Sequence, residues 1–171
     1  WNMLHRQVEQ ALHRWREPDR GVWEVRGEPR HFTSSKVMCW VAADRGSRLA
    51  WLREDIEAAE RWRSAADEIQ ADVCEHALDD RGVFTQHYDT KALDASNLLM
   101  PLLRFLPPGD ERIRNTVLAI AEDGREDELA AALAPLGERL RYDIDRDGFQ
   151  IVAVMDESHA EKPRDEGIAE T

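Results

Sequence analysis

The residues best suited to chemistry lie in one polar stretch, residues 18–36, between two helical segments. Its glycines and prolines exclude a helix, yet it contains residue types that bind and transform ligands: Trp23, Glu24, Arg26 and His31. A loop held between rigid helices is a common position for reactive residues. Glu24 is therefore the first candidate for a catalytic group.

Glu24 follows Trp23 directly and precedes Arg26 by two residues. An aromatic wall removes water from a carboxyl group and favours its protonated form, which suits a general acid. Residues 21–27 alternate briefly between two glycines, so we expect a short extended segment with Glu24 and Arg26 on one face. From spacing alone, a surface glutamate or a structural pair with Arg26 is the more common explanation.

Other reactive groups are less well supported. The six histidines are scattered, no Cys/His spacing fits zinc, and no glycine-rich phosphate loop is present, so we expect neither metal nor cofactor. Ser34, Ser35 and Lys36 could form a serine–lysine nucleophile pair, but a choice of helix N-caps at residues 33–35 is the simpler explanation.

Apolar periodicity predicts the elements that position this loop. Helices are expected over residues 1–16, 35–53, 56–77, 92–105 and from Asp110 to about residue 121. Pro101 predicts a kink or break in the fourth. Residues 83–88 alternate like a short strand, with His87 and Tyr88 either at the mouth of a pocket or packed in the core or the rim. The loops 21–32 and 83–89 are expected at one end of the helices.

Composition limits the partners. The chain of 171 residues has 35 acidic and 23 basic side chains, a net charge of −12, which argues against binding to nucleic acid or an anionic membrane. No apolar run could span a bilayer, and the first residues do not resemble a signal peptide. Cys39 and Cys74 lie in helical patterns and are predicted to be buried free thiols, which favours the cytoplasm.

Several motifs occur in a characteristic order. They are Trp-Arg-Glu-Pro-Asp at 15–19, Gly-Val-Trp-Glu-Val-Arg-Gly at 21–27, His-Phe-Thr-Ser-Ser-Lys-Val-Met-Cys-Trp-Val-Ala at 31–42, Gly-Val-Phe-Thr-Gln-His-Tyr at 82–88, Ala-Leu-Asp-Ala-Ser at 92–96 and Phe-Leu-Pro-Pro at 105–108. Together they resemble the bacterial glucoamylase- and trehalase-like members of glycoside hydrolase family 15. The resemblance covers about residues 1–122.

The resemblance implies an all-α fold, a partial (α/α)6 barrel with about five or six helices of a larger toroid. The helix over residues 35–53, apolar over a wide arc, would be an inner helix, and that over 56–77 an outer one. We expect residues 1–122 to form the partial barrel, 123–142 a divergent helical segment, and 143–171 a charged, disordered tail.

The same resemblance implies the chemistry. Glu24 matches the general acid that protonates the glycosidic oxygen of a short α-glucoside, such as trehalose or a maltose-type oligosaccharide. Trp23 would stack on a sugar face, and Arg26 and His31 would contact hydroxyl groups. We expect Glu24 at the mouth of a concave surface near Trp23 and His31.

An inverting hydrolase also needs a carboxylate base about 6.5–9.5 Å from the acid. Glu157, Glu161 and Glu166 lie in the charged tail and match no base motif. The expectation is therefore a fragment, inactive alone, whose inner-helix residues Val37, Trp40, Val41 and Leu99 are uncovered and drive self-association. The alternative is a non-catalytic α-helical binding or interaction module.

Overall fold

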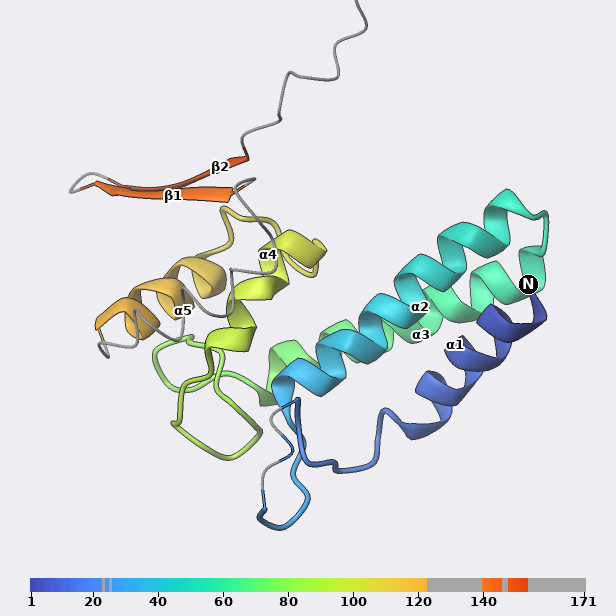
Figure 1. Ribbon diagram of the computed structural model, residues 1–171, viewed down its shortest axis with the longest axis horizontal. Coiled ribbons are helices and arrows are strands. Elements are labelled where there is room, and N and C mark those ends of the chain that lie inside the picture. Colours follow the sequence, from blue (N-terminus) through green and yellow to red (C-terminus); the bar gives the residue numbers. More distant parts are fainter. Residues whose placement is uncertain (23, 25, 123–139, 146–147, 154–171) are drawn as a thin grey trace, which may run out of the picture. The chain divides into compact units, whose positions relative to one another are not determined.

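The structure is a computed structural model that describes residues 1–22, 24, 26–122, 140–145 and 148–153, and the chain divides into two units at residues 132 and 133. The described part of the first unit is helical (Figure 1). Its elements are α1 (Asn2–Arg14), α2 (Thr33–Leu52), α3 (Ile56–His76), the 3-10 helix η1 (Ala95–Leu99), α4 (Met100–Leu103) and α5 (Glu111–Glu122).

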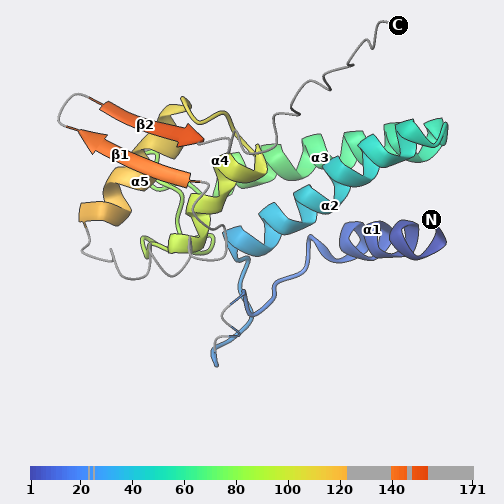
Figure 2. The same cartoon turned by 45° about the horizontal axis from the view of Figure 1, so that its top comes forward.

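Helices α1, α2 and α3 lie side by side, and successive helices run in opposite directions (Figures 1 and 2). A compact cluster of apolar residues joins them: Val8, Ala50, Ala58, Ala59 and Trp62. Gly46 permits the close approach, because a Cβ atom there would lie 2.9 Å from Val8 Cγ2 and 3.0 Å from Trp62 Cε3. The Trp62 indole also donates a 2.7 Å hydrogen bond to Glu9 Oε1, so this tryptophan fixes α3 to α1.

The fourth predicted helix is broken, as Pro101 indicates. Residues 95–99 form η1, and α4 begins at Met100 with the proline in its first turn. Asp94 caps η1 by accepting a 2.8 Å bond from the Ser96 amide. After α4, the Phe105 ring packs edge-to-face on Trp40 at a centroid distance of 5.1 Å, which joins this region to α2.

Asp110 precedes α5 and caps it. Its Oδ1 accepts a 3.0 Å bond from the Arg112 amide, and its Oδ2 lies 2.8 Å from the Arg112 guanidinium. The bond from Arg112 lowers the pKa of Asp110 despite partial burial, so the carboxylate stabilises the fold above its ordinary pKa. That contribution is lost as the pH falls through the folded-state value.

We therefore expect Asp110→Ala to lower the free energy of unfolding by about 1 kcal/mol at pH 7. The measurement is urea unfolding of the 171-residue chain at pH 7 and in steps down to pH 3. The difference between parent and variant should shrink as Asp110 becomes protonated. A difference that stays constant down to pH 3 would show that the carboxylate contributes nothing through its charge.

Two predictions about α2 are wrong. The helix begins at Thr33 with Phe32 as its N-cap, and no side-chain hydroxyl group caps it. Val37 and Trp40 are only 3% and 2% exposed, because the region around α4 and Phe105 covers this side of the helix. Other apolar side chains of α2 are exposed instead: Met38, Leu49, Trp51 and Leu52.

The second unit contains a two-stranded antiparallel hairpin. Strand β1 (Leu140–Asp145) pairs with β2 (Gly148–Ala153), from Leu140 opposite Ala153 to Asp145 opposite Gly148. The boundary predicted at residue 143 falls inside β1, so disorder is the wrong prediction for these strands. The expectations for residues 123–139 and 157–171 lie outside the described residues. Among the described helices, none has the length and apolar character needed to cross a membrane.

Candidate active site

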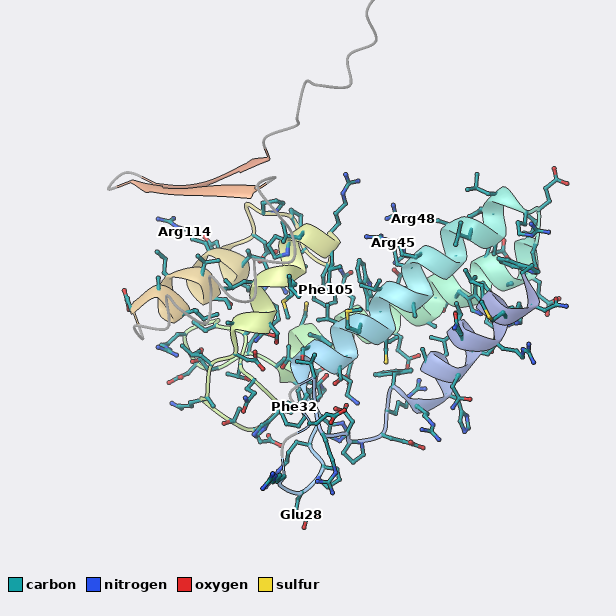
Figure 3. All side chains as sticks on the ribbon, viewed as in Figure 1. Glu28, Phe32, Arg45, Arg48, Phe105 and Arg114 are labelled. Carbon is teal, nitrogen blue, oxygen red and sulfur yellow. The ribbon has the colours of Figure 1, made fainter. Side chains whose placement is uncertain are left out.

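The loop that carries Glu24 is closed at its neck by two backbone hydrogen bonds. The Asp19 amide donates to the Arg30 carbonyl at 2.8 Å, and the Arg30 amide donates to the Asp19 carbonyl at 2.7 Å. Inside the neck, Arg20 Nη1 donates to the Gly27 carbonyl at 2.8 Å. Residues 20–29 therefore form a closed loop whose tip, at Glu28, points away from the helices (Figure 3).

Glu24 lies in a turn within this loop and not in the predicted extended segment. Its amide donates to the Gly21 carbonyl at 3.2 Å, and its φ is 46°. A left-handed backbone is uncommon for a residue other than glycine, and such conformations concentrate at functional sites. The predicted alternation fails because the closed neck forces the chain to reverse within a few residues.

Glu24 and Arg26 do not form the structural pair that spacing alone favoured. The side chains of Glu24 and Arg26 are both exposed, and within the described part of the loop they form no ion pair with each other. Trp23 lies outside the described residues, so its stacking on a sugar stays a prediction.

The loop is fastened to the first turn of α2. Ser35 Oγ donates a 2.8 Å bond to Asp19 Oδ1, which also accepts from the Gly21 amide at 2.5 Å. Lys36 is 1% exposed, and its ammonium group donates to the carbonyl oxygens of Trp15 and, at 2.7 Å, Glu17. Burial lowers the pKa of Lys36, and the charge of Asp19 opposes that shift.

Sequence reasoning missed this role of Ser35 and Lys36 by treating the run as helix caps. A signal was present, because Lys36 lies on the same helix face as Thr33, Val37 and Trp40, which are all buried. A lysine inside a buried stripe needs partners for its charge, and here they are backbone carbonyl groups.

A second loop meets the first at the start of α2. The Thr33 amide donates to the Gln86 backbone carbonyl at 3.0 Å, and the Tyr88 amide donates to the His31 carbonyl at 3.1 Å. These bonds form the antiparallel bridge between Phe32 and His87. The two loops therefore lie at one end of α2, as predicted.

One cavity, of about 570 Å³, lies beside His31 and has charged walls. The His31 ring stacks on Tyr88, and Tyr88 stacks on His76, both at 5.5 Å between centroids. The Tyr88 hydroxyl donates a 2.6 Å bond to Asp72 Oδ2. Burial, aided by the charge of Lys36, lowers the pKa of His31, so the imidazole is neutral at pH 7.

A second cavity, of about 440 Å³, lies at the start of α2 and has no charged residue in its lining. Gly21 and Val22 form its edge on the side of the Glu24 loop. Hydroxyl and amide groups and aliphatic side chains form the rest, among them Ser34, Met38, Ser96, Asn97 and Leu99. The lining is mainly aliphatic, and the hydroxyl and amide groups are its hydrogen-bonding groups for a ligand.

The predicted site residues do not converge on one cavity. Val22, two residues before Glu24, lines the neutral cavity, whereas His31 lines the charged one, and Glu24 and Arg26 line neither. Within the described residues, no three His, Cys, Asp or Glu side chains form a group that could hold a metal ion.

Comparison with known proteins identifies the relatives of this chain. The family model described as "Glycosyl hydrolases family 15" matches residues 2–151, which extends the similarity beyond residue 122, where the sequence prediction ended it. The chain is 64% identical over 129 residues to a trehalase of Mycobacterium tuberculosis, covering 75% of this chain and 19% of that protein.

Two further relatives are trehalases of Mycolicibacterium smegmatis and Thermoplasma volcanium. The first is 60% identical over 129 residues (75% of this chain, 19% of that protein), and the second is 33% identical over 124 residues (72% and 20%). The chain thus spans about a fifth of the length of the curated relatives it matches.

A solved structure, "Glycosidase F290Y", superimposes with a TM-score of 0.58 and 22% identity, over 68% of this chain and 31% of that chain. This likeness concerns the fold alone. With the family match, it confirms the expected partial (α/α)6 barrel.

Proposed function

Because the chain belongs to glycosyl hydrolases family 15, we propose that it carries the general acid of a glycoside hydrolase that cleaves an α-linked glucose disaccharide. Glu24 is the proposed acid, and trehalose is the proposed substrate. The observation that carries the choice of substrate is the 64% and 60% identity to two trehalases. A maltose-type oligosaccharide is the second candidate.

In the proposed reaction, Glu24 protonates the glycosidic oxygen while water attacks the anomeric carbon from the opposite face of the ring. The carbon–oxygen bond breaks, the departing glucose takes the proton, and a carboxylate base accepts a proton from the water. We assign no base among the described residues. The proposal places it in the remainder of a complete barrel, and the coverage of the relatives by this chain, about a fifth, supports that arrangement.

The structural support comes from the loop. Glu24 sits in a left-handed turn whose preceding residues, Gly21 and Val22, edge the neutral cavity. The hydroxyl and amide groups of this cavity can bond sugar hydroxyl groups, and its aliphatic side chains can pack on the apolar face of a glucose ring. We therefore propose that the scissile bond lies between Glu24 and the neutral cavity, with Trp23 and Arg26 as further sugar contacts.

The test uses a chimera in which the 129 matching residues of the Mycobacterium tuberculosis trehalase are replaced by those of this chain. We expect it to hydrolyse α,α-trehalose, with equal initial amounts of α- and β-glucose seen by ¹H NMR. Inversion converts one ring to the β-anomer and leaves the departing ring as the α-anomer. The unmodified trehalase is the control.

Initial release of α-glucose alone would contradict inversion. Faster hydrolysis of maltose than of trehalose would favour the glucoamylase-like alternative.

A non-catalytic binding module is the second candidate function. It is favoured by the exposure of Glu24 and its absence from the lining of both cavities. Such a module would bind trehalose with unchanged affinity when Glu24 is replaced, and the chimera would not hydrolyse trehalose.

Two further expectations belong to this proposal. The exposed apolar side chains of α2 support contact with the rest of a barrel or with a second copy. Cys39 and Cys74 are free thiols and half-buried, which supports a cytoplasmic location.

A further inference from the structure

The Glu24 loop depends on contacts outside itself for its position. Ten residues between Asp19 and Arg30 lose much conformational entropy when they adopt one arrangement. Proton transfer nevertheless requires the acid within hydrogen-bond reach of the leaving oxygen, and a misplacement of about 1 Å can cost about 10²-fold in rate. The contacts that hold the neck therefore decide where Glu24 lies.

We infer that Asp19, Ser35 and Lys36 are positioning residues for the acid, an inference that rests on the proposed role of Glu24. Asp19 acts through one oxygen: Oδ1 accepts from Ser35 Oγ at 2.8 Å and from the Gly21 amide at 2.5 Å. The first bond fixes the neck to α2, and the second shapes the turn that leads to Glu24.

Lys36 holds the chain just before the neck. Its buried ammonium donates to the carbonyl groups of Trp15 and Glu17, which lie between α1 and Asp19. A buried charge is costly unless it is well bonded, so an apolar side chain would fill this space at less expense. The charge is useful here because it binds the carbonyl oxygens of Trp15 and Glu17, which lie in the segment between α1 and α2.

Gly21 completes the arrangement on the other side of the neck. Its φ is 69°, and a Cβ atom there would lie 2.8 Å from Phe32 Cδ1. The loop thus packs directly on the ring at the start of α2. The hydrogen bonds of Asp19 and Lys36 and the packing of Gly21 on Phe32 therefore set the loop on the first turn of α2.

The chain offers a matched control variant for the test. Ser35 Oγ bonds Asp19, whereas Ser64 is exposed on α3 and lines neither the neutral nor the charged cavity. Ser35→Ala removes one positioning bond, and Ser64→Ala removes the same hydroxyl group away from the loop and the cavities.

The readout compares two substrates of the chimera. Trehalose needs protonation of its leaving oxygen, whereas α-glucosyl fluoride has a leaving group that needs little help from the acid. We expect Ser35→Ala to lower kcat for trehalose about 10-fold, and Lys36→Met about 10²-fold, with less than about 2-fold change for the fluoride. A variant that merely folds less well would lower both rates equally.

Asp19 provides a rescue. Asp19→Ala should behave like Lys36→Met, while Asp19→Asn, which keeps an oxygen acceptor at the same place, should retain most of the trehalose rate. In the 171-residue chain itself, Ser35→Ala should speed hydrogen exchange of the Asp19 and Arg30 amides at least about 5-fold relative to Ser64→Ala, because their mutual bonds open more often.

The inference is overturned if Ser35→Ala matches Ser64→Ala in both the substrate ratio and the exchange rates, or if both substrates slow equally. In that case a large loss in Glu24→Gln would still leave the general-acid proposal intact. If Glu24→Gln itself has no effect, the proposed function fails instead, and the exchange rates alone report whether these residues hold the loop.

Discussion

A Glu24→Gln variant of the chimera is expected to hydrolyse trehalose about 10²–10⁴-fold more slowly than its parent. The amide has nearly the shape of the carboxyl group but cannot release a proton to the glycosidic oxygen. The KM for trehalose should change little, since the variant loses an interaction that acts in the transition state. The measurement is initial rates at saturating and limiting trehalose.

Glu28→Gln is the matched control, because Glu28 lies in the same loop and is also exposed (Figure 3). It should leave both kcat and KM within about 2-fold of the parent, as expected for a surface substitution. Activity of Glu24→Gln within about 5-fold of the parent would rule out Glu24 as the acid. Hydrolysis of α-glucosyl fluoride should survive in Glu24→Gln far better than that of trehalose.

The largest expected effect on stability is that of Trp62→Ala, a loss of about 3–5 kcal/mol in the free energy of unfolding. Trp62 is 0% exposed and packs between α1 and α2, in contact distance of Val8 and Gly46. Its removal leaves a cavity and takes the indole hydrogen bond away from the carboxylate of Glu9. Since domains have only about 5–15 kcal/mol of stability, the loss is a large share of the total.

Urea unfolding of the 171-residue chain, followed by helical circular dichroism, measures this loss. Trp51→Ala is the control, because Trp51 is 56% exposed at the end of α2, and its replacement should cost no more than about 0.5 kcal/mol. Equal losses in the two variants would contradict the assignment of Trp62 to the core.

The helices follow from the sequence because their signals are local. Apolar spacing at three and four residues predicts α1, α2 and α3 to within two residues at each end, and the sequence also locates the start of α5. Pro101 breaks its helix because its ring removes the backbone N–H donor and fits only the first turn of a helix. Several motifs in order, between residues 15 and 108, indicated the family, which the match over residues 2–151 confirms.

The burial of α2 depends on the tertiary structure. Val37 and Trp40 were expected to be exposed, because periodicity shows that a face is apolar but not which segment covers it. Phe105 supplies that cover from 65 residues further along the chain. Cover by distant segments is a long-range property that no local pattern encodes.

The geometry of the candidate site was likewise decided by tertiary contacts. By sequence, Ser35 and Lys36 begin a helix, and only folding brings the Trp15 and Glu17 carbonyls, 21 and 19 residues away, to the buried ammonium. The backbone of Glu24 is set by the neck at Asp19 and Arg30, which overrides the local alternation. The sequence therefore determined which residue is the acid candidate, and long-range hydrogen bonds determined where that residue lies. Such bonds join groups far apart along the chain, so no local sequence pattern predicts them.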